Sequence, residues 1–414
     1  MPCQNLSQEL FEKIIAIWGL KMKRALLVAS VASMVDQFNM QNIRLLKELG
    51  YHVDVACNFV DGNTCSNERV KELKFKLTKE KVGCFQVDFA RDVLQLKQNI
   101  KAFRQLQAIA RKKRYKLVHC HAPIGGVLGR LVFRKYRKMG TSVIYTAHGF
   151  HFFKGAPVKN WILYYPVEKF LSRWTDCLIT INKEDYRRAK RKFHADRMVY
   201  VPGVGVDTEK FNSGLVDISA KRASLGVTDN DIMLLSVGEL SVRKNHQIVI
   251  RALKELNNPR IKYFIAGQGE LQEYLTELIK DYGLNDKIFL LGYRTDISEL
   301  CQAADLFVFP SKQEGLPVAL MEAIACKIPV YCSDIRGNVE LVKNKEFLFD
   351  PTNEENLVSG LRKMFGEKKY EEFKERSKKE ILENYKQLLL FDLNYVNTKM
   401  SGLYYTSGGG ITKL

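Results

Sequence analysis

Short apolar runs alternate with helical patterns along almost the entire chain, and this alternation is the feature that most constrains its fold. In the first half, runs typical of strands cover residues 25–30, 52–57, 116–120, 142–147 and 177–181. In the second half, they cover residues 232–238, 262–267, 287–292, 305–310 and 329–332. Helical patterns separate these runs, notably over residues 38–49, 93–113, 245–257, 270–282 and 317–326. Strands that are apolar on both faces and alternate with helices form parallel sheets covered on each side, so we predict an α/β fold with two such sheets.

The domain organisation follows from the number of strands. A chain of 414 residues is long enough for two domains of ordinary size. The predicted organisation is an extension over residues 1–21, a Rossmann-like domain over 22–203, a second Rossmann-like domain over 204–384, a helix over 385–404 that crosses back to the first domain, and a flexible tail over 405–414. Two doubly wound domains that face each other leave a central cleft at the carboxyl ends of their strands, where ligands bind in such sheets.

The stretch SKQEGLPVALMEAIACKIPV, residues 311–330, contains the strongest candidate site. A strand ends just before it, and Pro317 suits the first turn of a helix, where its missing N–H costs nothing. The free N–H groups of that helix start suit an anion such as a diphosphate, and Gly315 lets the backbone approach a ligand closely. Glu314 precedes the helix and Glu322 lies more than one turn along it, and a carboxylate can bind the vicinal hydroxyls of a sugar. The arrangement fits a sugar nucleotide, although two Glu at this spacing are in general more often surface charges.

Other strand ends in the second half carry further candidates. Arg243 and Lys244 lie between a strand end and the next helix, where they either neutralise a leaving diphosphate or form an ordinary helix-surface pair. The tight turn at Gly267 and the loop at Arg294 follow the next two strands. They are weaker candidates for contacting the donor and its base, because a lone Gly-x-Gly carries little information.

Histidines and glycines follow two strand ends in the first half. His148 and His121 each come directly after a predicted strand, and Gly125 and Gly126 follow close behind His121. A lone His at a strand end is usually structural. Two of them beside glycines at the same sheet edge favour the lip of an active site.

The positive charge of the chain is concentrated in one region. The formal net charge is +19, and residues 101–200 hold 23 Lys or Arg against 5 Asp or Glu. Such a concentration indicates an anionic partner, which is anionic lipid, nucleic acid or a phosphorylated substrate. No apolar run reaches the roughly 20 residues that span a bilayer, and we find no good signal peptide.

Several kinds of chemistry have no matching motif. The nine cysteines are scattered without a Cys-x-x-Cys pair, which predicts a reducing, cytosolic compartment and no zinc site. The chain has no phosphate-binding Gly-x-x-x-x-Gly-Lys loop, no Gly-x-Ser-x-Gly elbow and no His-Glu-x-x-His helix. The Asp-Asn-Asp at residues 229–231 precedes a strand rather than following one, so we interpret it as a polar turn and not as a metal-binding Asp-x-Asp.

Together these motifs resemble glycosyltransferase family 4, which comprises retaining sugar transferases of the GT-B architecture. The Glu-x7-Glu element of residues 311–330 is the most specific part of the resemblance, which begins near residue 22. The segments SVGELSVRKNH, IAGQGE and TAHGFHFFKG support it in the expected order. The last of these, with HCHAPIGGVLGRL, resembles bacterial enzymes of capsular or exopolysaccharide assembly.

The resemblance implies a role for each matching residue. Glu314 and His148 would contact the donor sugar, His148 near the anomeric centre. Glu322 would hold the ribose, and Lys244 would stabilise the diphosphate. Backbone N–H groups near Gly315, Leu316 and Pro317 would contact the sugar and the diphosphate.

Two positions depart from the family pattern. Many members have Arg directly after the Gly that ends the strand at 232–238, whereas this chain has Glu239. Arg243 is the candidate to replace that contact. The Gly-Gly loop common after the first strand is replaced by SVASMVDQFN at residues 30–39, so the acceptor cannot be inferred from the resemblance.

The sequence therefore predicts a metal-independent, retaining glycosyltransferase that uses no cofactor, only a nucleotide-sugar substrate, which the resemblance suggests is UDP-linked. The second domain would bind this donor. The first domain would bind the acceptor, which the resemblance suggests is a polyprenyl-diphosphate-linked saccharide, with His121, Gly125 and Gly126 on the acceptor side. Region 101–200 would dock on the inner face of the membrane, because anionic lipid attracts each nearby Lys or Arg by about 1 kcal/mol.

Three alternatives remain at this point. The first is a soluble transferase with a cytosolic acceptor, and the second is a GT-B-type sugar-nucleotide epimerase. The third is a nucleic-acid-binding protein that uses the basic region. The absence of an aromatic-studded basic motif and the chemistry at the strand ends disfavour nucleic acid as a partner.

Overall fold

The computed structural model describes residues 23–61, 65–121, 123–203, 205–211, 216–366, 369–388 and 393–407. The expected extension at 1–21 lies outside these described residues. Of the expected tail, residues 405–407 belong to a helix and residues 408–414 also lie outside the described part.

The first domain is built on a parallel sheet of seven strands in the order β3-β2-β1-β4-β5-β6-β7. The strands are β1 (Arg24–Val31), β2 (His52–Asn58), β3 (Gly83–Gln86), β4 (Leu117–His121), β5 (Ser142–Ala147), β6 (Cys177–Thr180) and β7 (Arg197–Tyr200). All six pairs are parallel, and in the centre Leu27 of β1 pairs with His119 of β4. The five longest apolar runs of the first half are therefore the five inner strands, as predicted.

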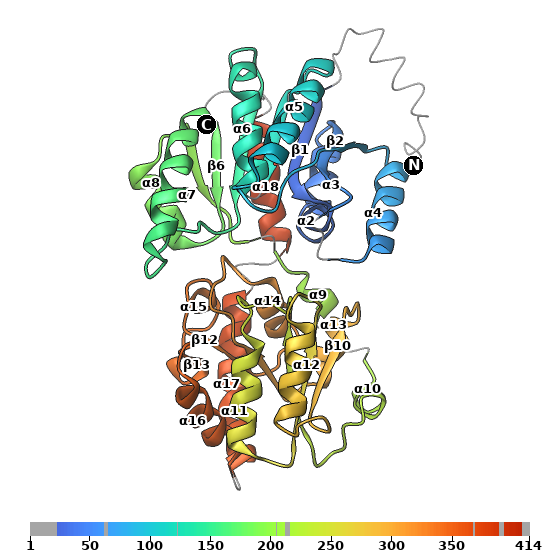
Figure 1. Ribbon diagram of the computed structural model, residues 1–414, viewed down its shortest axis with the longest axis vertical. Coiled ribbons are helices and arrows are strands. Elements are labelled where there is room, and N and C mark those ends of the chain that lie inside the picture. Colours follow the sequence, from blue (N-terminus) through green and yellow to red (C-terminus); the bar gives the residue numbers. More distant parts are fainter. Residues whose placement is uncertain are drawn as a thin grey trace, which may run out of the picture.

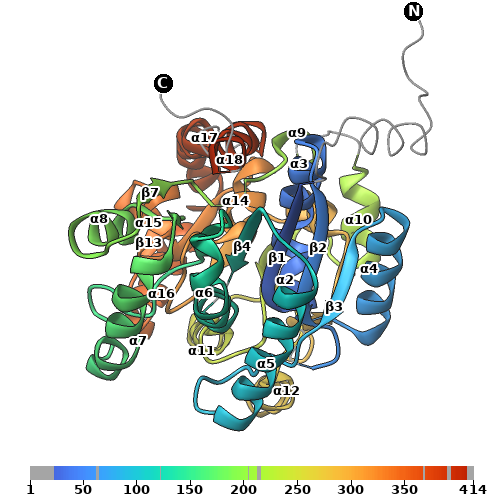
Figure 2. The ribbon, with the colours of Figure 1, turned by 90° about the horizontal axis from the view of Figure 1, so that it is seen from above.

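Helices cover both faces of this sheet (Figures 1 and 2). One face packs against α5 (Leu96–Lys112), α6 (Pro123–Arg137) and α7 (Val158–Leu171), and the other against α3 (Met40–Glu48), α4 (Asn67–Lys79) and α18 (Leu393–Ser407). Successive strand residues point to opposite faces. Leu26 and Val28 of β1 accordingly join one core, and Ala25 and Leu27 join the other.

The second domain repeats this plan with six strands in the order β10-β9-β8-β11-β12-β13. Its strands are β8 (Ile232–Val237), β9 (Ile261–Ala266), β10 (Ile288–Gly292), β11 (Leu306–Phe309), β12 (Val330–Ser333) and β13 (Leu348–Phe349). Its helices include α11 (His246–Leu256), α12 (Gln272–Asp281), α13 (Ile297–Ala303), α14 (Val318–Ala325), α15 (Asn338–Leu341), α16 (Glu354–Phe365) and α17 (Lys369–Leu388). All five strand pairs are parallel, and one continuous apolar core joins the sheet to its helices.

The strand order of each sheet reverses at one place, between β1 and β4 in the first domain and between β8 and β11 in the second. Loops that leave neighbouring strands at such a point diverge and leave a crevice at the carboxyl edge, which is where ligands bind in open α/β sheets. In Figure 1 the first domain lies above the second. The site is therefore expected where the loops after β1, β4, β8 and β11 meet.

Some elements differ from the sequence prediction. Strands β3, β7 and β13 were not predicted, and all three lie at sheet edges, where a strand with one neighbour needs less apolar character. The helix expected over 38–49 is α3, and the loop expected over 30–39 contains a further helix, α2 (Ala32–Phe38), which ends at Asn39, whose side-chain amide donates to the carbonyl of Met34 at 3.1 Å.

The last predicted helix, over residues 385–404, is two elements. Helix α17 continues to Leu388, and α18 begins at Leu393. Helix α18 packs in the core of the first domain, where Tyr404 is fully buried and its hydroxyl lies 2.8 Å from Nδ1 of His119. The chain thus returns to the first domain after building the second.

Candidate active site

The loops after β8 and β11 lie side by side at the reversal point of the second sheet. Asn245 fixes them, since its side-chain amide donates to the carbonyls of Pro310 at 3.2 Å and Pro351 at 3.0 Å. The backbone N–H of Lys312 donates to the carbonyl of Arg243 at 2.9 Å. These contacts hold the two candidate loops of the sequence analysis in one fixed arrangement.

A carboxylate with two cations forms the centre of this arrangement. Oε1 of Glu314 lies 2.7 Å from Nζ of Lys244 and 3.1 Å from Nη1 of Arg243, and the Glu314 side chain is almost fully buried. Burial by itself raises the pKa of Glu314, but the charges of Lys244 and Arg243 outweigh burial, so the pKa lies below its ordinary value. Arg243 also lies 3.8 Å from the carboxylate of Glu239. The loops therefore present fixed positive charge beside a permanently ionised acid.

At Gly315 the backbone of the second domain is in close contact with the first domain. A Cβ at this position would lie 2.3 Å from the carbonyl oxygen of His148, so no larger residue fits. Gly149, with a φ of +112°, faces Gly315 from the other side. Leu316 is buried, and Pro317 is the residue before the first turn of α14. The start of α14 is thus pressed against the loop that carries His148.

Glu322 lines a pocket between the two domains. This pocket has a volume of about 240 Å³, and its lining includes Arg44 of α3, Val206 and Asp207 of the connecting segment, and Val318 of α14. The eight-residue spacing therefore places Glu314 and Glu322 at two different pockets along the same interdomain cleft.

Three histidines continue the site into the first domain. Nδ1 of His121 lies 3.1 Å from Nε2 of His148, and the ring of His121 lies 3.9 Å from that of His119. His119 also contacts Thr146, with 2.8 Å between Nε2 and Oγ1. Burial lowers the pKa of His148 to about 4 and that of His119 to about 3, and it lowers the pKa of His121 well below its ordinary value. All three rings are therefore neutral at pH 7, and His148 can act through hydrogen bonds rather than charge.

The low pKa values of these buried histidines predict that the protein loses stability in acid. Unfolded histidine takes up a proton near pH 6.5, whereas folded His148 does so only near its pKa of about 4. Below pH 6.5 the unfolded state therefore binds more protons, and each such histidine lowers the free energy of unfolding by up to about 1.4 kcal/mol per pH unit. We expect the thermal midpoint to fall between pH 6.5 and pH 5 in calorimetry at constant ionic strength. The variant His148→Gln should reduce the slope, the exposed control His194→Gln should not, and a midpoint independent of pH would contradict this.

A pocket of about 360 Å³ opens between His148 and the second domain. Glu314, Gly315 and Arg243 line it from one side, and His148, Gly149 and helices α6 and α7 from the other. Within it, Glu168 is held by Arg130, with 2.8 Å between Oε2 and Nη2, and it accepts a hydrogen bond from the Tyr145 hydroxyl at 3.0 Å. The side of the pocket that the first domain forms is therefore lined by polar groups that are already bound to one another.

The cleft continues into a further pocket of about 590 Å³ that both domains line, around Glu239 and Arg91.

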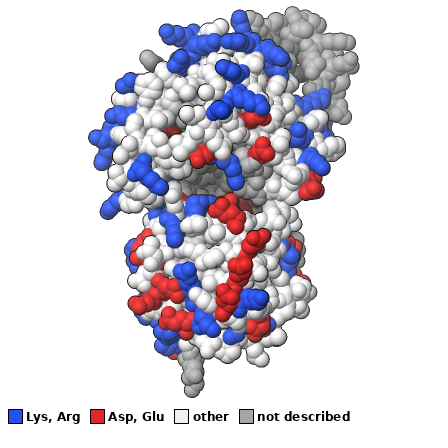
Figure 3. Space-filling view, viewed as in Figure 1, with Lys and Arg blue, Asp and Glu red and all other residues white. Residues whose placement is uncertain are grey.

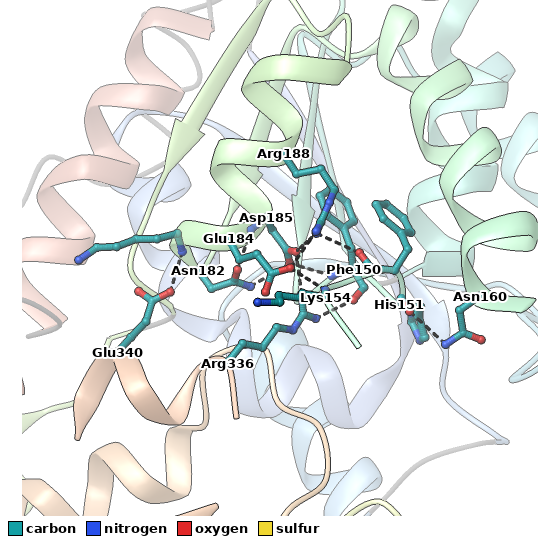
Figure 4. A network of polar contacts seen from close by, with 12 residues as sticks. Phe150, His151, Lys154, Asn160, Asn182, Glu184, Asp185, Arg188, Arg336 and Glu340 are labelled. Atoms are coloured by element: carbon teal, nitrogen blue, oxygen red, sulfur yellow. Dashed lines mark hydrogen bonds and ion pairs between the residues drawn. The ribbon is translucent and has the colours of Figure 1, made fainter. Parts of the chain in front are cut away.

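A polar network beside this pocket connects the two domains (Figure 4). Arg336, in the loop after β12, donates to Oδ1 of Asp185 at 2.7 Å and to the carbonyl of Phe150 at 2.6 Å. Oδ2 of Asp185, near the start of α8 (Lys183–Lys192), accepts from the N–H of Phe150 at 2.8 Å. Burial raises the pKa of Asp185, and Arg336 opposes this shift. One buried carboxylate thus holds both the loop after His148 and the second domain.

Replacing Arg336 with Gln is expected to destabilise the closed arrangement. Asp185 is fully buried, and removing one partner of a buried pair costs about 3 kcal/mol, which corresponds to a thermal midpoint lower by about 6 °C or more. Small-angle scattering should show a larger radius of gyration as the domains separate. The matched control is Arg362→Gln, since the Arg362–Glu255 pair is exposed and contributes less than about 1 kcal/mol. Equal midpoints for the two variants would contradict the interdomain role of Arg336.

Some candidate residues have packing roles instead. Gly125 and Gly126 lie in α6, where a Cβ on Gly126 would lie 2.3 Å from the Tyr145 ring, so these glycines let the helix approach the sheet. A Cβ on Gly267 would lie 1.8 Å from the carbonyl of Gly238, which explains this glycine by loop packing. Arg294 is paired with Asp296 and lines none of the three interdomain pockets.

The sequence analysis did not find Arg336, Asp185 or Glu168. Arg336 follows a predicted strand end at residue 332, so its position in the chain was a usable signal. Asp185 and Glu168 lie in helices, where an acid gives no sign of its partners. Their roles depend on contacts with residues far away in the sequence.

Comparison with known proteins identifies the class. The family model "Glycosyltransferase Family 4" matches residues 38–210, and "Glycosyl transferases group 1" matches residues 217–380. The chain is 38% identical over 328 residues to a protein of Bacillus subtilis named putative glycosyltransferase EpsD, covering 78% of this chain and 82% of that protein. The chain belongs to glycosyltransferase family 4, and it is a glycosyltransferase.

Two further matches extend this result. An Escherichia coli protein, UDP-Gal:alpha-D-GlcNAc-diphosphoundecaprenol alpha-1,3-galactosyltransferase, is 32% identical over 276 residues, covering 65% of this chain and 71% of that protein. The crystal structure of Anabaena Alr3699/HepE with UDP and glucose superposes with a TM-score of 0.72 at 21% identity, covering 93% of this chain and all of that one. The predicted GT-B fold of two facing Rossmann-like domains is thereby confirmed.

The described residues lack both a membrane-spanning helix and a metal-binding cluster. Within them, no helix has both the length and the apolar character that crossing a bilayer requires. No cluster of three or more His, Cys, Asp or Glu side chains suited to holding a metal ion occurs in that same part of the chain.

Proposed function

We propose that the protein transfers a sugar from a UDP-activated donor to a polyprenyl-diphosphate-linked saccharide during assembly of a cell-surface polysaccharide. The observation that carries this proposal is the Glu314–Lys244–Arg243 cluster. It lies at the reversal point of the second sheet and faces His148 across a pocket of about 360 Å³. The cluster combines the positive charge that a leaving diphosphate requires with an acid that accepts hydrogen bonds from sugar hydroxyls.

The donor would lie along the cleft from one acid to the other. Its diphosphate would lie at the start of α14 and against Lys244, where free N–H groups and a cation both favour negative charge. Glu314 would accept hydrogen bonds from the donor sugar, and Glu322 would bind the ribose in the pocket of about 240 Å³. Arg243, already between Glu239 and Glu314, would supply the second positive charge.

Retention of the anomeric configuration is proposed to proceed by attack from the front face, without an enzyme nucleophile. The described acids that line the 360 Å³ pocket are Glu168 and Glu314. Each is already bound to a cation, Arg130 or Lys244, which makes it a poor nucleophile. The acceptor proton would instead pass to the donor phosphate. Proton NMR of the product should show the anomeric configuration of the donor, and an inverted product would exclude this mechanism.

The acceptor side of the proposal rests on charge and on similarity. Lys and Arg side chains gather on the upper domain in Figure 3, whereas acids are more frequent on the lower one. Region 101–200 carries 23 Lys or Arg against 5 acids, which suits an anionic membrane surface where a lipid-linked acceptor would be presented. The name of the Escherichia coli relative states that it acts on a diphosphoundecaprenol-linked sugar. We propose the inner face of the membrane as the location.

A donor screen tests this proposal without knowledge of the acceptor. UDP-, GDP- and dTDP-sugars are incubated with the protein, and release of nucleoside diphosphate is measured as slow donor hydrolysis. We expect release from one or a few UDP-sugars, and we expect it to continue in excess EDTA because no metal is proposed to take part. Release from GDP-sugars alone would overturn the UDP assignment, and loss of release in EDTA would overturn metal independence.

A further inference from the structure

Helix α7 turns an apolar face to solvent. Its side chains Val158, Ile162, Leu163, Val167 and Phe170 are 74%, 72%, 44%, 40% and 50% exposed. At 3.6 residues per turn, these five positions fall on about one half of the helix circumference. A surface helix normally shows water its polar face. An exposed apolar face of this kind, here with the exposed Lys159 within it, marks a protein or membrane interaction site.

The border of this face is cationic and aromatic. Exposed cations lie on and beside it, namely Lys159 of α7, Arg134 of α6, and Arg173, whose guanidinium lies 5.9 Å from the centre of the Phe170 ring. The rings of Phe170 and Trp174 are in edge contact at 4.9 Å, and the guanidinium of Arg134 lies 5.0 Å from the centre of the Trp174 ring. The single acid of α7, Glu168, is buried and paired with Arg130. An apolar stripe with cations and an amphipathic aromatic at its border matches a helix that lies in a membrane interface.

The opposite face of α7 belongs to the candidate active site. Tyr164 and Glu168 line the 360 Å³ pocket, and Tyr164 stacks on His151 with 4.6 Å between ring centres. Figures 1 and 2 both place α7 at the outer edge of the first domain. One helix thus separates the pocket from an unpartnered apolar surface, and a substrate anchored in that surface would need to cross only the width of a helix.

We propose that α7 lies flat in the interface of an anionic bilayer, with its apolar face among the acyl chains and its bordering cations at the headgroups. This inference rests on the proposed function and deepens it, since it names the docking element and orients the pocket towards the lipid surface. Charge selects the bilayer over a second copy of the chain, because a symmetric contact between two such faces would bring like charges together. Anionic headgroups neutralise the same cations.

The inference is tested by measuring how strongly a double variant of the protein binds vesicles. The double variant Ile162→Gln/Val167→Gln keeps the net charge and removes apolar side chains that do not line the pocket. Binding is measured by flotation with vesicles of phosphatidylglycerol and phosphatidylcholine at 0.1 M and 0.5 M NaCl. At 0.5 M NaCl the attraction between exposed charges is largely screened, so apolar insertion dominates what remains. We expect the double variant to bind about 30-fold more weakly than the unmodified protein at 0.5 M NaCl.

The matched control is Phe75→Gln/Leu382→Gln, which removes side chains that are 73% and 52% exposed on α4 and α17. It should bind vesicles as the unmodified protein does. Equal vesicle binding by both double variants would overturn the inference. So would sedimentation showing an α7-dependent dimer that does not bind vesicles.

Donor hydrolysis, measured without vesicles, separates this inference from the proposed function. It should be the same in both double variants as in the unmodified protein. If the unmodified protein binds vesicles through α7 but hydrolyses no nucleotide-sugar, the proposed function fails and the docking surface stands.

Discussion

Replacing Lys244 with Ala is expected to lower kcat by about 100- to 1,000-fold in protein that remains folded. A fixed positive charge aimed at the leaving diphosphate stabilises charge that develops only in the transition state, and removing one such group typically has an effect of this size. Lys244 is well placed for this task, because its ammonium is held 2.7 Å from Glu314 and 4.8 Å from the centre of the Phe309 ring. It therefore needs little reorganisation when the donor binds.

The matched control for this prediction is Lys312→Ala. Lys312 lies on the neighbouring loop and is exposed. Its loss removes one positive charge from the same region but leaves the charges that line the site unchanged. Turnover is measured as donor hydrolysis and as transfer, with thermal midpoints taken on the same samples. If Lys244→Ala and Lys312→Ala reduce kcat equally and slightly, only general surface charge is involved and the assigned role of Lys244 is wrong.

Replacing Glu314 with Gln is expected to lower kcat/KM by about 100-fold, a loss of roughly 2.7 kcal/mol of transition-state stabilisation. The substitution keeps the shape of the side chain but removes its charge. The donor sugar then loses a charged acceptor, and Lys244 and Arg243 lose the carboxylate that aligns them. Because the pKa of Glu314 lies below its ordinary value, protonation should reproduce part of this loss only in strong acid, and the profile of kcat/KM above pH 6 should not report Glu314.

A double-mutant cycle separates the two contributions of Glu314. If Glu314 acts chiefly by holding Lys244, the double variant Lys244→Ala/Glu314→Gln should be little worse than Lys244→Ala alone. If it also contacts the sugar, the effects should be closer to additive. Glu239→Gln is the matched control, because Glu239 contacts Arg243 at 3.8 Å from a more exposed position. Full activity of Glu314→Gln would remove Glu314 from the site.

The inner strands of both sheets and the edge strand β10 could be predicted from the sequence, and the edge strands β3, β7 and β13 could not. Strands such as β1 and β8 are buried on both faces, so they read as continuous apolar runs. Edge strands β3 and β7 are mixed in polarity and only partly buried, and their sequences resemble loops. Helix α2 was missed because it is only seven residues long and directly follows β1, in the segment expected to be a loop.

The candidate site was predictable where its signals are local. Glu314, Gly315 and Pro317 lie within eight residues after a strand end, so strand–turn–helix geometry places them at the carboxyl edge of a sheet. Arg336 and Asp185 meet from positions 151 residues apart, and no local pattern connects them. For the candidate glycines, the position could be predicted but the role could not. Gly126 and Gly267 both follow the carboxyl end of a strand, but a sequence does not tell whether a missing Cβ makes room for a ligand or for a neighbouring segment.

The most direct test of the central claim is transfer of a labelled sugar into a lipid phase. Radiolabelled UDP-sugars selected by the donor screen are incubated with the protein and anionic vesicles that contain membrane lipids from a polysaccharide-producing bacterium. The lipids are then extracted and counted. The account predicts label in an acid-labile, polyprenyl-diphosphate-linked fraction, and loss of that label with Lys244→Ala. Label that remains entirely in the aqueous phase, on a soluble acceptor or as free sugar, would contradict the assignment of a lipid-linked acceptor.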